Sequence, residues 1–219
     1  MNFNDIVEKR QSIRRYKEGD IPEADLKEMI RVAGLAPSGK NIQNWHFVVI
    51  KDLKTKQDIA DIIKKKNLEL CAEVEKVAEG KGDKFAKFAS KLTYFWRDTA
   101  PVLIVVLTKE YLPSSYAEYE LIGAETELLN SLKHKKNPGM QSLGAAVENL
   151  TLKAVEMGYG TCWLTSANYV DKEIEAYLKE KHGIEKEGYF MAAMMSMGIP
   201  QDDQPSPPKK NPEEIATFI

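Results

Sequence analysis

Apolar residues recur at helical spacing in several segments of the chain. Residues 22–35 open with a proline, carry acidic residues early, and place Leu26, Met29 and Ala33 on one face. A proline in the first turn and early acids are typical of helix starts, so an amphipathic helix is predicted here. The same spacing predicts helices over three later segments, residues 53–63, 140–157 and 171–183.

Four shorter apolar runs have the length and composition of strands. They are HFVVI (46–50), VLIVVL (102–107), TCWLT (161–165) and GYFMAAMMSMG (188–198). The run at 102–107 is apolar throughout, as expected of a strand covered on both faces. Because helices and strands alternate without a consistent βαβ rhythm, the pattern favours an α+β fold in which helices sandwich the sheet.

The chain, residues 1–219, has the length of a single domain with a substantial core. Within it, residues 64–100 mix lysine with acidic residues and are predicted to form a solvated helical region, which is a candidate lid. At its end, Tyr94, Phe95 and Trp96 have two interpretations. They stack on a substrate as part of a lid, or they form an aromatic cluster in the core.

Charge balance and cysteine content argue against several classes of function. The 31 basic and 33 acidic residues nearly cancel, so no bulk attraction to nucleic acid or an anionic membrane is indicated. Cys71 and Cys162 lie far apart without metal-ligand spacing, and the apolar runs are too short to cross a bilayer. We therefore expect a soluble, cytoplasmic protein with no metal site and no nucleic-acid or membrane partner. The commonest dinucleotide and triphosphate loops, GxGxxG and GxxxxGKS/T, do not occur.

A short basic segment, RQSIRRY (10–16), carries the first candidate site residues. Arg10, Ser12 and Arg14 alternate along it, so in an extended chain their side chains share one face while Ile13 points to the other. Two guanidinium groups and a hydroxyl suit a phosphate, because arginine presents paired donors in one plane. The alternative is that these arginines are simply solvated. We call Arg10, Ser12 and Arg14 the basic comb.

A second candidate lies in the loop APSGKNIQNWHF (36–47). If the chain is already extended after Gly39, then Asn41 and Gln43 share a face and present two amides that suit a flat heterocycle. Ser38 and Gly39 would keep the loop narrow and let backbone N–H groups approach a ligand. Ordinary turn chemistry is the competing explanation, since Ser, Gly and Asn are common in turns.

Together with two later blocks, these segments resemble the FMN-dependent nitroreductase family. The later blocks are AAVENLTLKAVEMGYGTCWLTS (145–166), and MGIP (197–200) followed by PPKKNPEEI (207–215). The order of the blocks is the family's order, and they span nearly the whole chain. Within the loop, Ile42 and Asn44 stand where the family usually has a small residue and a proline.

The resemblance implies an intertwined α+β homodimer, with a mostly antiparallel sheet and FMN held at the subunit interface. The basic comb and a basic residue near the C-terminus would hold the phosphate and ribityl chain, and Asn41, from the partner subunit, and Gln43 would face the ring. The cofactor-binding residues implied in this way are Arg10, Gln11, Ser12, Arg14, Ser38, Gly39, Asn41, Gln43, Trp163, Leu164, Thr165, Ser166, Lys209 and Lys210.

The implied function is that of an FMN-dependent oxidoreductase. It would transfer hydride from NADH or NADPH, through the flavin, to a flat electrophile such as a nitroaromatic or a quinone, with ping-pong kinetics. No catalytic side chain is needed, because the flavin carries the chemistry. The sequence leaves open a flavin destructase that makes dimethylbenzimidazole, a reductive dehalogenase of the same fold, and a non-catalytic flavin-binding module.

Overall fold

A computed structural model describes residues 1–89, 91, 93–201 and 204–219, and a five-stranded sheet lies at its centre. The strands are β1 (Tyr16–Lys17), β2 (Trp45–Ile50), β3 (Val102–Lys109), β4 (Gly160–Leu164) and β5 (Tyr189–Pro200). β5 pairs antiparallel with β3 along one edge and with β4 and β1 along the other, and β2 pairs antiparallel with β3. The predicted α+β fold with a mostly antiparallel sheet is confirmed.

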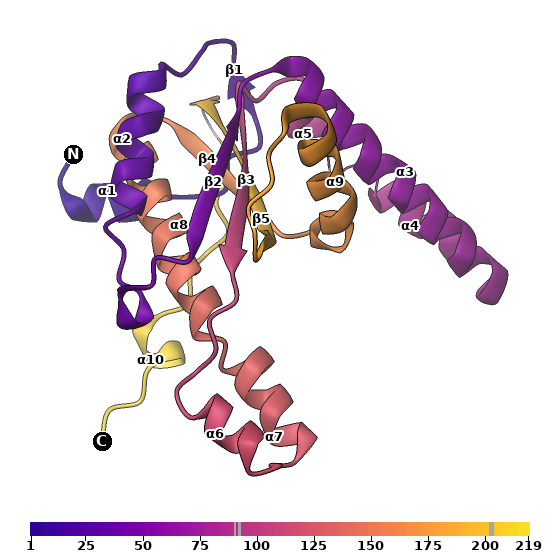
Figure 1. Ribbon diagram of the computed structural model, residues 1–219. Helices are drawn as coiled ribbons and strands as arrows, with labels where there is room; N and C mark the ends of the chain where they lie inside the picture. The colour runs from indigo at the N-terminus through magenta and orange to yellow at the C-terminus, as the bar shows by residue number, and fades with distance from the viewer. Residues whose placement is uncertain (90, 92, 202–203) are drawn as a thin grey trace.

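Helices cover both faces of this sheet. Figure 1 shows α2 and α8 on one side of the strands and α3, α5 and α9 on the other. In chain order the helices are α1 (Phe3–Lys9), α2 (Glu23–Ala33), η1 (Gly39–Asn41), α3 (Leu53–Val77), α4 (Lys81–Ala89), α5 (Tyr94–Arg97), α6 (Tyr116–Leu121), α7 (Thr126–Asn130), η2 (Ser131–Lys135), α8 (Pro138–Glu156), η3 (Asn168–Val170), α9 (Asp171–His182) and α10 (Pro212–Ile215). Within the described part of the chain, none of them is long and apolar enough to cross a membrane.

The central strand β3 divides the core into two clusters. Its residues Val102, Ile104 and Val106 pack with α2 and α8, whereas Leu103 and Val105 pack with α3 and α9. Each side chain of a strand points to the face opposite its neighbours, so burial on both faces requires apolar residues at every position. This arrangement accounts for the uninterrupted apolar run at 102–107.

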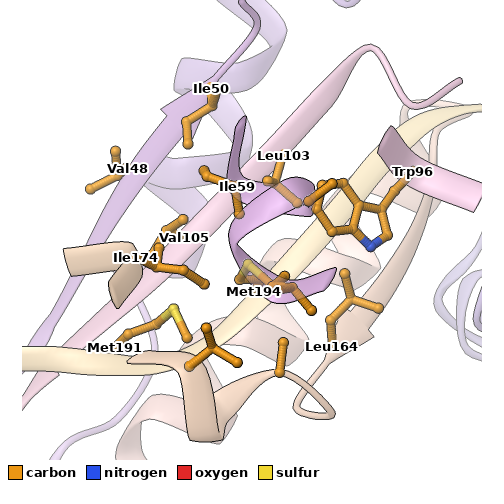
Figure 2. Close-up of a cluster of buried hydrophobic side chains, with 14 of the residues drawn as sticks. Val48, Ile50, Ile59, Trp96, Leu103, Val105, Leu164, Ile174, Met191 and Met194 are labelled. Carbon is orange, nitrogen blue, oxygen red and sulfur yellow. The ribbon is translucent and has the colours of Figure 1, made fainter. Parts of the chain in front are cut away.

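The aromatic cluster at 94–96 divides between core and surface. Trp96 is 1% exposed and Phe95 is 7% exposed, whereas Tyr94 is 64% exposed. Figure 2 shows Trp96 beside Leu103 and Leu164 in the cluster between the sheet and α3. The core interpretation therefore holds for Phe95 and Trp96, whereas Tyr94 is largely open to solvent.

The candidate lid region, residues 64–100, includes most of a helical hairpin. α3 and α4 form the hairpin, which projects from the body of the molecule in Figure 1. The Glu75 carboxylate accepts hydrogen bonds from the backbone N–H groups of Gly80 (2.7 Å) and Gly82 (2.8 Å). A methyl group at Gly82 would lie 2.5 Å from the Cys71 carbonyl oxygen, so glycine allows the two helices to meet closely. Positions 90 and 92 lie outside the described residues, and the role as a lid remains a prediction.

Candidate functional site

The basic comb lies on an extended segment beside β4. The backbone N–H of Ile13 donates to the carbonyl of Thr161 at 2.8 Å, and Ser12 forms a parallel bridge with the same residue. Ile13 is buried, and its side chain occupies the space that a Cβ on Gly160 would take, only 2.6 Å from Ile13 Cγ1. Ile13 therefore points into the core as predicted, while Ser12 and Arg14 are exposed.

Arg14 and the segment after β4 line the same hollow, which has a volume of about 360 Å³. Its lining comes from the comb, from the end of the candidate lid and from β4 with the turn that follows. The lining residues are Arg14, Lys91, Tyr94, Phe95, Cys162, Trp163, Leu164, Thr165 and Ser166. The structure thus brings together Arg14 and all four residues at 163–166 that the resemblance implies.

Trp163, which forms one wall of this hollow, borders α8. Trp163 is 40% exposed, and a methyl group at Gly144 of α8 would lie 3.8 Å from its ring atom Cη2. Trp163 therefore lies against α8 on one side and opens to the hollow on the other. An apolar ring next to a guanidinium group provides surfaces for both an aromatic and an anionic part of a ligand.

Two titratable groups near the hollow are held in their neutral forms. Burial raises the pKa of the Cys162 thiol, while the charge of Arg14 and a hydrogen bond with Ser12 lower it to a smaller extent. Burial also raises the pKa of the Tyr16 phenol above its ordinary value, against the opposing effect of a hydrogen bond with Ser196. The sulfur is therefore a protonated thiol at neutral pH and does not suit nucleophilic catalysis.

The other basic residues predicted for the site lie in different surroundings. Arg10 already has an anionic neighbour, because its Nε lies 3.6 Å from Glu148 Oε1 on α8. Lys209 and Lys210 are exposed on the C-terminal segment just before α10. Gln11 is half-buried, and its Nε2 donates to the carbonyl of Gln204 at 3.0 Å. Arg14 is thus the predicted cation that lines the hollow.

The chain is not extended after Gly39, so the condition under which Asn41 and Gln43 would share a face by alternation is not met. Residues Gly39–Asn41 form the short 3-10 helix η1, and Lys40, Asn41 and Gln43 have positive φ angles of 52°, 54° and 47°. The amides nevertheless meet, because Gln43 Nε2 donates to Asn41 Oδ1 at 3.1 Å. The Ser38 hydroxyl accepts from the backbone N–H of Gln43 at 3.0 Å, so a turn rather than a strand brings the two side chains together.

We call the loop that carries these two amides, residues 36–47, the amide loop. It lies at the start of α8 rather than in the hollow. η1 contacts α8, and a methyl group at Gly39 would lie 2.6 Å from Tyr111 Cε1. Asn44, which replaces the family's usual proline, is buried and donates through Nδ2 to Thr108 Oγ1 (2.8 Å) and to the Gly139 carbonyl (3.1 Å). Those bonds join the loop to β3 and to α8, and a proline side chain could not make them.

Gln204 is a structural neighbour of the comb that the sequence pattern did not indicate. Its side-chain oxygen accepts from the backbone N–H groups of Arg14 and Arg15, both at 3.0 Å. The surrounding segment, QPSPP at 204–208, has neither apolar periodicity nor a recognisable ligand spacing. Its contact with residues 14 and 15 depends on tertiary structure alone.

The chain is similar over nearly its whole length to several known proteins. A BluB-like flavoprotein from Clostridium difficile 630 has a crystal structure that matches with 52% identity and a TM-score of 0.95, covering 100% of this chain and 99% of that one. A nitroreductase with bound FMN from Bacteroides fragilis NCTC 9343 shares the fold at 19% identity and a TM-score of 0.70, with coverage of 100% and 99%. An iodotyrosine deiodinase of Thermotoga neapolitana is 25% identical over 94% of this chain and 92% of its own length.

Most of the chain also matches a family model. The model of the nitroreductase family covers residues 7–199, which include the basic comb, the amide loop and the residues that follow β4. This match confirms the resemblance found from the four sequence blocks. The chain belongs to the nitroreductase family.

Proposed function

We propose that the chain is an FMN-dependent oxidoreductase that takes hydride from NADH or NADPH and reduces a flat electrophilic acceptor. The observation that carries this proposal is the hollow in which Arg14 faces the segment from Trp163 to Ser166. Its volume, about 360 Å³, is in the range of small-molecule sites. A nitroaromatic or a quinone is the acceptor class that fits such a site beside a flat cofactor.

The donor groups around the hollow fit FMN. The guanidinium of Arg14 and the hydroxyl of Ser12 suit a phosphate dianion, because a charged planar fork donates two parallel hydrogen bonds to its oxygens. Trp163 and Leu164 offer apolar surface to a tricyclic ring, and the backbone near Thr165 offers N–H groups beside it. FMN, when bound, supplies the hydride chemistry, and the protein binds and orients the reactants.

The position of the amide loop supports a homodimer. Asn41 and Gln43 pair with each other beside α8, away from the lining of the hollow in their own chain. In the proposed dimer, Asn41 of the partner subunit reaches the flavin ring in this hollow. The site would then be complete only at the subunit interface, and FMN affinity would depend on dimerisation.

A second candidate activity is reductive dehalogenation. It is favoured by the similarity to the iodotyrosine deiodinase of Thermotoga neapolitana, which covers 92% of that protein. An iodinated phenol is also a flat aromatic acceptor, so the same hollow serves either reaction. The two activities differ in the acceptor that reoxidises the reduced protein.

An anaerobic absorbance experiment tests the proposed function. The FMN-loaded protein is mixed with NADH or NADPH. Its visible flavin absorbance band is expected to bleach on the time scale of catalytic turnover. Adding a quinone or a nitroaromatic should restore the band, and restoration by an iodinated phenol would instead support dehalogenation. A band that returns incompletely on exposure to air would favour the flavin destructase, and a band unchanged by both nicotinamides would reject the enzyme in favour of a passive flavin binder.

Tyr94 tests whether the candidate lid contacts the acceptor. Its ring lines the hollow and is 64% exposed, so Tyr94→Ala removes an aromatic wall without opening the core. We expect the KM for an aromatic acceptor to rise about threefold to tenfold, the usual range for losing one aromatic contact. Phe85→Ala, which removes an exposed aromatic from α4 outside the hollow, is the matched control. An unchanged KM and acceptor preference in the folded Tyr94→Ala variant would reject the lid.

A further inference from the structure

The side chain of Gln204 uses its full hydrogen-bonding capacity on the backbone around the basic comb. Its Oε1 accepts from the N–H groups of Arg14 and Arg15, both at 3.0 Å. Its Nε2 donates to the carbonyls of Arg15 (2.9 Å) and Gln201 (2.8 Å). An amide offers two acceptor lone pairs and two donor hydrogens, and here all four are engaged.

These bonds hold the backbone at the end of the basic comb, after Ile13. Ile13 is already held on two sides, by its N–H bond to the Thr161 carbonyl and by the Tyr16 hydroxyl, which donates to the Ile13 carbonyl at 2.8 Å. Beyond Ile13, the N–H groups of Arg14 and Arg15 point to the C-terminal segment, where Gln204 satisfies both. Gln204 is thus the contact that sets the backbone of Arg14 itself.

We infer that Gln204 is a positioning residue for the cofactor phosphate, acting through Arg14. This inference depends on the proposed FMN site. An exposed arginine loses side-chain entropy when it binds, and a fixed backbone limits how much more must be ordered. By the same bonds, Gln204 also ties the start of the segment that carries Lys209 and Lys210 to the backbone of Arg14 and Arg15.

The contribution of Gln204 to folding should be small. Arg14 and Arg15 are exposed, so their N–H groups can bond to water when the glutamine is removed. Ile13 and the strand pairs of β4 remain in place without Gln204. A variant at this position is therefore expected to fold and to differ from the native protein in ligand binding.

The test compares FMN with riboflavin, which has the same ring but no phosphate. For Gln204→Ala we expect FMN to bind about tenfold more weakly, because the arginine is no longer preordered, while riboflavin affinity changes less than about twofold. Gln201→Ala is the matched control, because only the backbone of Gln201 takes part in these bonds. Both dissociation constants follow from quenching of flavin fluorescence.

The FMN and riboflavin affinities of Gln204→Ala and of the native protein distinguish three outcomes. A ratio of FMN to riboflavin affinity that stays at the native value in Gln204→Ala would overturn the inference. Equal weakening of both ligands would also overturn it, because a general structural defect does not distinguish the phosphate. If the native protein itself binds the two flavins equally well, the phosphate grip in the proposed function fails, which is a separate outcome.

Gln204→Glu provides a second and independent variant. A carboxylate can still accept from the Arg14 and Arg15 N–H groups, but it cannot donate to the carbonyls of Arg15 and Gln201. It also places a negative charge next to the proposed phosphate. We expect FMN to bind at least as weakly as in Gln204→Ala, with a larger deficit at low salt than at high salt. Native FMN affinity in this variant would contradict the role of the amide.

Discussion

Arg14→Ala is expected to weaken FMN binding at least about a hundredfold, because hydrogen bonds from a charged group contribute about 1.5–3 kcal/mol each and Arg14 can donate a pair of them to a phosphate. Arg14 is the comb residue that lines the hollow, whereas Arg10 is already close to Glu148. The variant should therefore purify with little flavin. Isothermal titration with FMN measures the change in the dissociation constant.

Two further variants sharpen this prediction. Arg14→Lys keeps the charge but loses the planar fork, so its FMN affinity should lie between those of the native protein and Arg14→Ala. Arg31→Ala removes an arginine that pairs with Glu28 on the surface of α2, and its FMN affinity should be native. Full flavin content in a folded Arg14→Ala protein would mean that the phosphate is held elsewhere.

Trp96→Ala is expected to lower the free energy of unfolding by about 3–5 kcal/mol, the usual cost of replacing a large buried aromatic residue with alanine. Trp96 is 1% exposed and belongs to the cluster that includes Leu103 and Leu164. Figure 2 shows Leu164, which also lines the hollow, next to the Trp96 ring. The cavity left by the substitution should therefore also weaken the support of the flavin site. Urea denaturation of the variant and the native protein gives the difference.

Tyr94→Ala serves as the matched control for this loss. Tyr94 lies two residues before Trp96 in the same short helix, but its exposed ring should contribute less than about 0.5 kcal/mol to stability. A Trp96→Ala protein as stable as Tyr94→Ala would contradict the placement of the indole in the core. In that case the lid interpretation of Trp96 would need to be reconsidered.

Patterns that arise from burial were predictable from the sequence. The apolar run at 102–107 predicted a strand covered on both faces, and β3 has its two sets of side chains in the two core clusters. The alternation of Arg10, Ser12 and Arg14 likewise placed Ile13 on the opposite face of the segment if it is extended, and Ile13 is buried while Ser12 and Arg14 are exposed. In both cases the spacing of residues along one segment determines which side chains can share a face.

Features that depend on contacts between distant segments were not predictable in the same way. The amides of Asn41 and Gln43 meet through a left-handed turn, a conformation for which alternating spacing gives no signal. Gln204 meets the comb only because the C-terminal segment folds back on the N-terminal one. Tyr94 is exposed and Trp96 is buried because of how α5 packs against α3. The residue types alone do not determine this packing.

FMN is proposed to occupy the hollow between the basic comb and the segment after β4. A crystal structure of the FMN complex tests this claim most directly. We expect the phosphate in ion-pair contact with the Arg14 guanidinium, the ring against Trp163 to Thr165, and the amide of Asn41 of the partner subunit at the ring. A phosphate bound away from Arg14, with that guanidinium left in solvent, would contradict it.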